Sequence, residues 1–431
     1  MTATLTSTAP GARPKASATT IAAITIGNGL EFFDFAVYGF FAVLIGSIFF
    51  PAKDAVDSLM LAVGSYGLSL LARPLGGVVL GLYADRAGRK PAMTLTLILM
   101  AAGSLGVAVA PTYAQIGVLA PIWLICARLV QGFALGGEVG ASTSLLLEYA
   151  DDHNRGYFGS WQFFSQGLAG VLGAAFAAVL TNTLSHDALY AWGWRIPFFI
   201  GALTVPVGVY IRRHLDETLG HQPQAGESSK AKLKEVLQTH AGLVWSGVLL
   251  LLGSTIATYI VAYYFSSYAT QFLKMPLSLT LWANVTATCV IALTAVFAGK
   301  LADRIGRKPL IAWSRLALVV LVLPCFMLLD TYRSAPALMG VVAAMGLLLT
   351  LQTVPVIVML TEIFPRPIRA TSLSIVYSLG VAVFGGTAQL FVTWLISATG
   401  SNLAPAWYLI VGTLISTIPL IWLKDMNGKP I

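Results

Sequence analysis

The sequence predicts an all-α membrane protein in which twelve transmembrane helices form two pseudo-symmetric bundles of six. Three observations lead to this fold class. The chain of 431 residues is 57% hydrophobic and only 10% charged, whereas a soluble domain carries about 25% charged residues. Its apolar residues fall into twelve long runs, and a charged decapeptide of the first half returns in the second half.

Each apolar run is long enough to cross a bilayer, because a spanning helix needs about 20 residues. Only helices and closed barrels satisfy every backbone polar group inside lipid, and runs of this length favour helices. The predicted spans are residues 21–50, 58–83, 91–111, 117–147, 159–182, 194–213, 241–268, 277–300, 309–329, 335–362, 370–398 and 404–423.

The spans divide the chain into two halves with polar segments around them. Residues 214–240 form the one long polar stretch and are predicted to be a linker. The complete division is a tail at 1–20, a first bundle at 21–213, the linker at 214–240, a second bundle at 241–423 and a tail at 424–431.

Two motifs support the internal repeat. GLYADRAGRK at Gly81–Lys90 returns as GKLADRIGRK at Gly299–Lys308, and the acidic and basic ends of Glu148–Arg155 match those of Glu362–Arg369. Each motif lies in a short turn between equivalent spans of its half. Repeats of this kind are typical of carriers built from two homologous halves.

The placement of the basic residues, which give the chain a net charge of +8, sets its topology. Most Lys and Arg residues fall in turns that must share one side of the membrane, and few, such as Lys53 and Arg195, fall on the other. The positive-inside rule then predicts that both termini and the linker are cytoplasmic. Because topology accounts for the basic residues, no nucleic-acid partner is expected.

The histidines lie in loops or at their edges without metal-ligand spacing, so no metal, cofactor or catalytic site is expected.

Five segments carry a family resemblance, namely GNGLEFFDFAVYGF at 27–40, LLARPLGGVVLG at 70–81, RLVQGFALGGEVG at 128–140, WGWRIPFFIG at 192–201 and LTEIFPRPIRATS at 360–372. With these segments the chain resembles the major facilitator superfamily, and within it the metabolite:proton symporter group. GSWQFFSQ at 159–166 and SLGVAVFGG at 378–386 are most similar to the citrate/tricarboxylate–proton symporters.

This resemblance implies a monomeric carrier of the bacterial inner membrane that works by alternating access. Its expected partners are the lipid bilayer, a small organic anion such as citrate or another di- or tricarboxylate, and a proton as coupling ion. Other cargoes of the same group stay open, namely shikimate, 2-oxoglutarate, betaine and proline. Sodium-coupled citrate uptake also stays open.

Charged residues inside spans need a reason, since each costs about 2.5–3.5 kcal/mol at the bilayer centre. Such residues are predicted at Glu31, Asp34, Arg73, Arg128, Glu138 and Arg315. The polar residues of the first and fourth spans recur at helical spacing, so they face protein or a water-filled cavity. Arg315 lies near the end of its span and is expected to extend its side chain to the membrane boundary.

Asp34 is the preferred residue for proton coupling. A carboxylate beside an arginine holds its charge, and it takes up a proton more readily when movement separates the pair. The resemblance implicates the residues matching Asp34 and Arg128 in this step, with Glu31 and Glu138 as rival sites. The alternative is a fixed ion pair that only holds the first and fourth spans together.

A central anion site is predicted from arginines, amides and tyrosines of both halves, because guanidinium groups pair well with carboxylates. The candidate substrate-binding residues are Asn28, Arg73, Arg128, Gln131, Gln162, Gln166, Tyr259, Tyr263, Asn284, Gln352 and Tyr377. The aromatic residues have packing as an alternative role. Arg73 precedes Pro74 and has the alternative of capping a backbone carbonyl that the proline leaves unpaired.

The repeated motifs also predict a gate. Aspartates at helix N-termini accept hydrogen bonds there, and ion pairs that form in one state bias an equilibrium between two conformers. The candidate gating residues are Asp85, Arg89, Glu148, Arg155, Asp303, Arg307, Glu362 and Arg369. The glycines at 132, 136 and 140 are predicted to form a close-packing seam.

Overall fold

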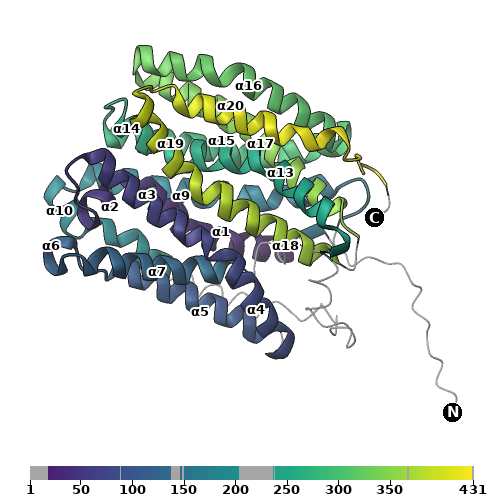
Figure 1. Cartoon of the computed structure of the whole chain (residues 1–431), viewed down its shortest axis with the longest axis horizontal. Helices are drawn as coiled ribbons and strands as arrows, with labels where there is room; N and C mark the ends of the chain where they lie inside the picture. The colour runs from purple at the N-terminus through teal and green to yellow at the C-terminus, as the bar shows by residue number, and fades with distance from the viewer. Residues whose placement is uncertain are drawn as a thin grey trace.

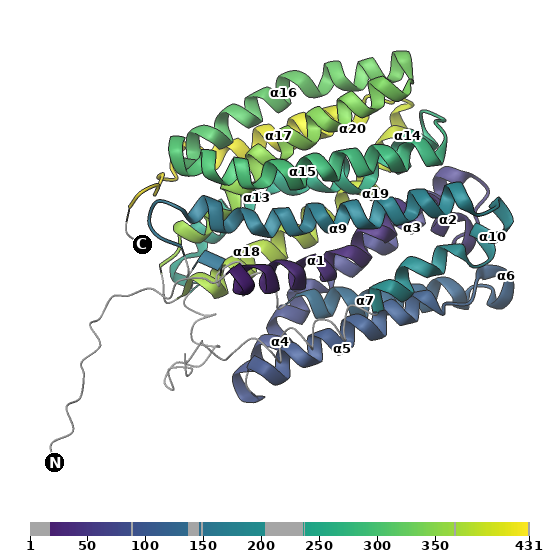
Figure 2. The same cartoon turned by 180° about the vertical axis from the view of Figure 1, so that it is seen from behind.

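A computed structural model describes residues 18–87, 89–136, 146–147, 150–202, 236, 238–365 and 368–429 of the chain. Every regular element in these ranges is a helix. The helices run side by side along the long axis of the molecule, those of the first half beside those of the second (Figures 1 and 2). This arrangement is the predicted pair of helical bundles.

The first half begins with a broken helix. α1 (Ala18–Phe40) continues into α2 (Ala42–Phe49), and the two axes differ by 71° between Phe32–Phe40 and Ala42–Phe49. The other elements of this half are α3 (Ala55–Leu71), α4 (Arg73–Ala87), α5 (Arg89–Ala108), α6 (Tyr113–Ile116), α7 (Leu119–Leu135), α9 (Arg155–Thr183), α10 (His186–Ala191) and η1 (Gly193–Arg195). Residues 196–202 are helical and start the sixth predicted span.

The second half contains two spans that change their helical type. Its elements are α13 (Ala241–Thr258), the π-helix η2 (Tyr259–Tyr264), α14 (Phe265–Gln271), α15 (Leu277–Ile305), α16 (Arg307–Tyr332), α17 (Ala335–Glu362), α18 (Arg369–Gly380), the π-helix η4 (Val381–Gly385), α19 (Gly386–Thr399), α20 (Ala404–Thr417) and the 3-10 helix η5 (Ile418–Ile421). The π-helices interrupt the seventh and eleventh spans, and such segments are frequent at functional sites.

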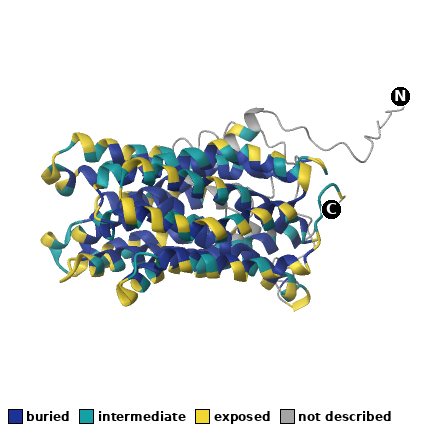
Figure 3. Ribbon diagram, turned by 90° about the horizontal axis from the view of Figure 1, so that it is seen from above, coloured by how far each residue is buried: buried dark blue, intermediate teal, exposed yellow. Residues whose placement is uncertain are grey.

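The described helices suit a bilayer. Within the described ranges, eight continuous helical stretches are long and apolar enough to cross a membrane, and the bent α1–α2 pair makes a ninth. Exposed residues lie largely on the outer helix faces and in the loops (Figure 3). They include large apolar side chains, such as Leu293 with 78% exposure and Ile421 with 79%. An apolar outer surface of this kind fits contact with lipid.

Glycines allow the second and fourth spans to touch through their backbones. A Cβ atom on Gly132 would lie 1.6 Å from the Ser69 carbonyl oxygen, and one on Gly136 would lie 2.0 Å from the Arg73 carbonyl oxygen. The predicted close-packing seam is therefore present at these two glycines. Gly140 lies outside the described residues.

The two halves approach each other closely at several points. α9 packs against α15 (Figure 2), and a Cβ on Gly156 would lie 2.3 Å from the Gly299 carbonyl oxygen. Nearer the middle of the spans, a Cβ on Gly67 of α3 would lie 2.0 Å from the Gly386 carbonyl oxygen of α19. The halves thus touch backbone to backbone at two levels of their junction.

Arg315 departs from expectation, because its side chain is buried and does not reach the membrane boundary. One guanidinium nitrogen donates to the Leu250 carbonyl at 2.6 Å, and another donates to the Ser416 carbonyl. In a 3-10 segment, the Ser416 carbonyl would accept from residue 419. That residue is Pro419, which has no N–H group. The guanidinium therefore satisfies a carbonyl at the helix break.

Candidate functional site

Asp34 lies at the centre of a buried polar network in the first half. Its Oδ2 accepts a hydrogen bond from Gln131 Nε2 at 2.9 Å and one from the Ser104 hydroxyl. Gln131 Oε1 in turn accepts from Arg128 Nη1 at 2.7 Å. Asp34 and Arg128 are therefore connected through the Gln131 amide, where sequence analysis expected the two charged groups to meet. Ser104 of α5 had no signal in the sequence beyond being a hydroxyl in an apolar run.

The start of the sixth span packs directly on the Asp34 carboxylate. A Cβ atom on Gly201 would lie only 1.7 Å from Asp34 Oδ1. Any larger residue at this position would have to displace the carboxylate, so Gly201 helps to fix its place.

Arg128 is buried among aromatic rings. Its guanidinium carbon lies 4.4 Å from the ring centroid of Phe35, 4.3 Å from that of Tyr38 and 5.4 Å from that of Tyr66. Aromatic faces attract a cation electrostatically. Within the described residues, its Nε and Nη2 atoms have no hydrogen-bond partner. The guanidinium thus keeps donor capacity for a further group.

Tyrosines of the second half reach toward the same region. The Arg73 guanidinium carbon lies 5.7 Å from the Tyr377 ring centroid, and Arg73 also lies beside Tyr259. The Tyr259 ring is 6.1 Å from the Tyr66 ring and 5.6 Å from the Tyr263 ring. The rings of Tyr66, Tyr259, Tyr263 and Tyr377 therefore form a row between the two buried arginines, which we call the tyrosine row. It crosses from one half to the other.

A small cavity lies beside this row. Its volume is about 20 Å³, enough for about one water molecule. Gln166, Tyr263 and Thr353 are among the residues that line it. Gln166 Nε2 and the Thr353 hydroxyl have no hydrogen-bond partner among the described residues. The cavity is thus a mainly apolar space between the halves with a few polar groups at its wall.

The remaining candidate amides form two pairs that differ in whether their side chains are hydrogen-bonded. Asn28 and Gln162 bind each other, since Gln162 Nε2 donates to Asn28 Oδ1 at 3.2 Å and Asn28 Nδ2 donates to the Ser165 hydroxyl. Asn284 and Gln352 are fully buried, and their amide atoms have no partner in the described part of the chain. Among the described residues, Asn284 and Gln352 thus keep all their side-chain donors and acceptors available, whereas the first pair keeps only Gln162 Oε1.

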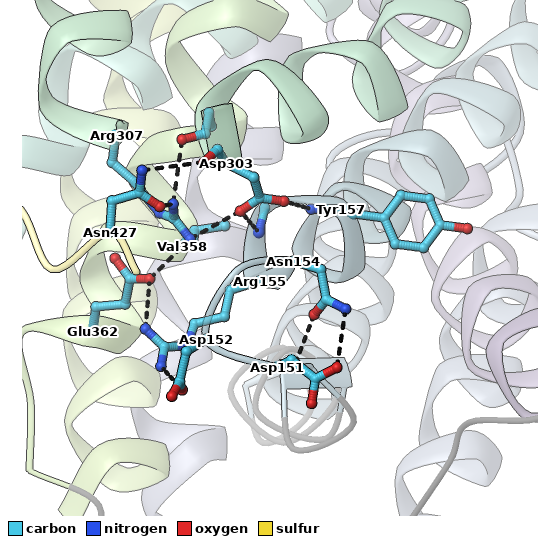
Figure 4. Close-up of polar contacts among 12 residues, drawn as sticks. Asp151, Asp152, Asn154, Arg155, Tyr157, Asp303, Arg307, Val358, Glu362 and Asn427 are labelled. Atoms are coloured by element: carbon cyan, nitrogen blue, oxygen red, sulfur yellow. Dashed lines mark hydrogen bonds and ion pairs between the residues drawn. The ribbon is translucent and has the colours of Figure 1, made fainter. Parts of the chain in front are cut away.

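A network of ion pairs joins the halves at one end, which we call the ion-pair end (Figure 4). Glu362 of α17 lies 3.3 Å from Arg155 of α9 and 3.1 Å from Arg307 of α16. Arg307 also pairs with Asp303 at 3.0 Å. One carboxylate, Glu362, thus receives an arginine from each half.

Asp303 also contacts a helix N-terminus of the other half. Its two carboxylate oxygens accept from the backbone N–H groups of Gly156 and Tyr157, at 2.8 and 2.9 Å (Figure 4). These N–H groups belong to the first turn of α9, where they lack partners within the helix and the helix dipole favours an anion.

The C-terminal residues take part in the same network, which sequence analysis did not foresee. The Asn427 side chain contacts Arg307 and donates to the Asp303 carbonyl at 3.2 Å. Asp425 accepts from the Lys308 backbone N–H at 2.9 Å. The Lys429 carbonyl accepts from Arg155 at 2.9 Å. The tail therefore touches arginines of both halves.

Other candidates are placed elsewhere or not at all. Arg369 donates to the Phe364 carbonyl at 3.3 Å. Glu138 and Glu148 lie outside the described residues. Glu31, Asp85 and Arg89 lie on α1, α4 and α5, but their side chains are outside the described part of the structure. Their predicted roles stay predictions.

Comparison with known proteins decides the family. Residues 24–331 match the family model for the Major Facilitator Superfamily. The chain belongs to this superfamily. It is 34% identical over 421 residues to a citrate-proton symporter of Klebsiella pneumoniae, with 96% of this chain and 93% of the relative covered. It is 30% identical over 426 residues to a proline/betaine transporter of Salmonella typhimurium, with 95% and 84% covered.

Solved structures agree on the fold. A crystal structure of a D-xylose-proton symporter superposes with a TM-score of 0.71 at 20% identity, covering 96% of this chain and 99% of that one. As a member of this superfamily, the chain is a multi-pass membrane transporter and not an enzyme. Its two helical bundles follow the major facilitator fold.

Proposed function

We propose that this transporter imports a small organic carboxylate together with protons, and that Arg73 and Arg128 bind the carboxylate between the two halves. The observation that carries the proposal is a pair of buried guanidinium groups on either side of the tyrosine row, each with at least one donor atom that has no partner among the described residues. A buried charge without a partner is costly. An anionic substrate would satisfy it through strong, charge-assisted hydrogen bonds.

A di- or tricarboxylate is the first candidate cargo. Two arginines offer positive charge for more than one carboxylate group, and the amides of Asn284 and Gln352 offer further neutral donors. The similarity to citrate-proton symporters of Klebsiella pneumoniae and Salmonella typhi supports this choice.

A zwitterion such as proline or betaine is the second candidate. The tyrosine row supports it, because aromatic faces attract quaternary ammonium groups. The similarity to proline/betaine transporters is comparable in extent to the similarity to citrate symporters. In this case one arginine would bind the single carboxylate and the rings would surround the ammonium group.

Asp34 is proposed as the proton carrier. Through Gln131, its carboxylate shares a hydrogen-bond network with Arg128. When a substrate carboxylate draws Arg128 away, the network loses its positive charge and Asp34 becomes easier to protonate. Proton uptake would then be linked to substrate binding at the same arginine. Glu31 and Glu138 stay rival carriers.

The ion-pair end is proposed to be the cytoplasmic gate. The sequence places both repeated basic motifs in turns on the same side of the membrane as this end. The positive-inside rule therefore favours a cytoplasmic location for the ion-pair end. In this arrangement the transporter works as a monomer in the bacterial inner membrane, with both termini and the 214–240 linker inside the cell. The Arg155–Glu362 pair would break when the site opens to the cytoplasm.

Uptake by purified protein in proteoliposomes tests the function. Labelled citrate, tricarballylate, proline and glycine betaine are offered with an imposed pH gradient, with a sodium gradient, or with neither. We expect a carboxylate to accumulate only with the pH gradient. Accumulation of proline or betaine would select the second candidate, and dependence on sodium would contradict proton coupling.

A further inference from the structure

The two π-helices of the second half meet at Gly385 and Tyr259. Gly385 ends η4, and Tyr259 begins η2. A Cβ atom on Gly385 would lie 2.5 Å from Tyr259 Cε2 and 2.9 Å from its Cδ2. Real Cβ atoms do not approach a ring this closely, so no other residue fits at position 385 unless the Tyr259 ring moves.

Span 11 also reaches the Tyr259 backbone. The Nε2 atom of Gln389, on α19, lies 3.5 Å from the Tyr259 carbonyl oxygen. Gln389 and Tyr259 are both buried. The ring and the main chain of Tyr259 are therefore both in contact with residues 385–389 of the eleventh span.

Tyr259 occupies the middle of the proposed binding site. On one side its ring lies 6.1 Å from the Tyr66 ring, which is beneath Arg128. On another side Tyr259 lies beside Arg73. A shift of this one ring would change the space next to both arginines.

We propose that Gly385 is a positioning residue that sets the place of the Tyr259 ring, and thereby sets which substrates fit between Arg73 and Arg128. The statement rests on the proposed function for the location of the binding site. Gly385 has no side chain of its own and acts through Tyr259. The wider turn of a π-helix, in which hydrogen bonding shifts by one residue, brings the glycine and the ring face to face.

A methyl group at position 385 would displace the Tyr259 ring and so change the space beside both arginines. Gly385→Ala should therefore weaken substrate binding and leave the later transport step largely intact. A single methyl-sized change in a pocket alters selectivity by about 10- to 200-fold. In a Tyr259→Ala background the added methyl group has room and should have no further effect.

The kinetic test uses a double-mutant cycle in proteoliposomes. The substrate is citrate, or glycine betaine if the wild-type protein carries that instead. Gly385→Ala should raise KM by about 10-fold or more with kcat changed by less than about 2-fold. The double variant Gly385→Ala/Tyr259→Ala should match Tyr259→Ala alone. Additive effects of the two substitutions would overturn the proposal.

Gly64→Ala is the matched control. Gly64 lies on α3 and faces the same eleventh span from the second span, but a Cβ there would be 3.8 Å from the Leu390 side chain, an ordinary contact. This variant should keep the wild-type KM.

A second readout does not need a transported substrate. In protein labelled with 3-fluorotyrosine, the fluorine resonance of residue 259 is assigned by its loss in Tyr259→Phe. Gly385→Ala should shift this resonance, and Gly64→Ala should leave it in place. An unmoved resonance in Gly385→Ala would overturn the positioning role. Absence of citrate and betaine transport by the wild type would instead contradict the proposed function.

Discussion

The Arg155 guanidinium of the first half lies 3.3 Å from the Glu362 carboxylate of the second, and both side chains are buried. Arg307 approaches the same carboxylate at 3.1 Å. Removing one partner from a buried ion pair costs about 3–5 kcal/mol, because the other charge is left uncompensated. The closed ion-pair end therefore depends strongly on this single carboxylate.

Glu362→Gln is expected to open the ion-pair end. The amide keeps the size of the side chain but loses the charge that two arginines share. Spin labels at positions 153 and 304, one on each half, should report longer and broader distances than in the unsubstituted protein. Asp330→Asn, at an exposed ion pair with Arg333, is the control and should leave the distances unchanged. An unchanged distance in Glu362→Gln would show that the pair does not hold this end closed.

The C-terminal residues should stabilise the same closed state. Asn427→Ala removes contacts to Arg307 and to the Asp303 carbonyl. A side-chain hydrogen bond contributes about 0.5–1.5 kcal/mol, and more when it involves a charged group. We expect a lower Tm and broader distances between the two labels. Lys424→Ala, at an exposed neighbouring position, should have neither effect. Equal Tm values and label distances in the two variants would show that the C-terminal residues do not hold the gate closed.

Gly201→Ala should disturb Asp34 without changing any charged residue. The added Cβ would overlap the carboxylate, so the bond from Gln131 must lengthen or break. Misplacement of a functional group by about 1 Å can cost about 100-fold in rate, and we expect proton-driven uptake to fall by at least about 10-fold on this basis. Gly242→Ala, where nothing lies within 4 Å of the new Cβ, should transport normally. Wild-type uptake in Gly201→Ala would argue against a fixed Asp34 position.

Arg315→Met should destabilise the second half. The substitution keeps an apolar side chain of similar length but leaves the Ser416 carbonyl without a donor and removes a second donor from the Leu250 carbonyl. A buried polar group without a partner costs about 1–3 kcal/mol. The Tm should fall, while KM of the protein that remains folded should not change. A changed KM with unchanged Tm would point to a role in the binding site.

The sequence was sufficient to predict the helices and their division into two halves. Apolar length and basic turns depend only on residues near one another in the chain. The sixth span is described only at its start, and the limits of the linker are untested. The bend near Phe41 and the π-helix at Tyr259–Tyr264 were not foreseen, because such breaks depend on packing against other helices.

The site was predictable in its residue types and less in its contacts. Helical spacing placed Asp34 and Gln131 on polar stripes, but it did not show that the amide of Gln131 connects Asp34 to Arg128. That contact depends on how each helix is rotated about its axis. The wrong expectation for Arg315 has a similar origin, since Pro419 creates the free carbonyl that keeps it inside and lies about a hundred positions later in the sequence.

Asp34→Asn in proteoliposomes tests proton coupling most directly. The variant is compared with the wild type for accumulation driven by a pH gradient and for exchange of labelled against unlabelled substrate at equal pH. Because the amide cannot carry the proton, accumulation against a gradient should be lost while exchange continues. Uphill accumulation by Asp34→Asn at the wild-type level would contradict the account, and loss in Glu31→Gln or Glu138→Gln instead would assign the proton to that residue.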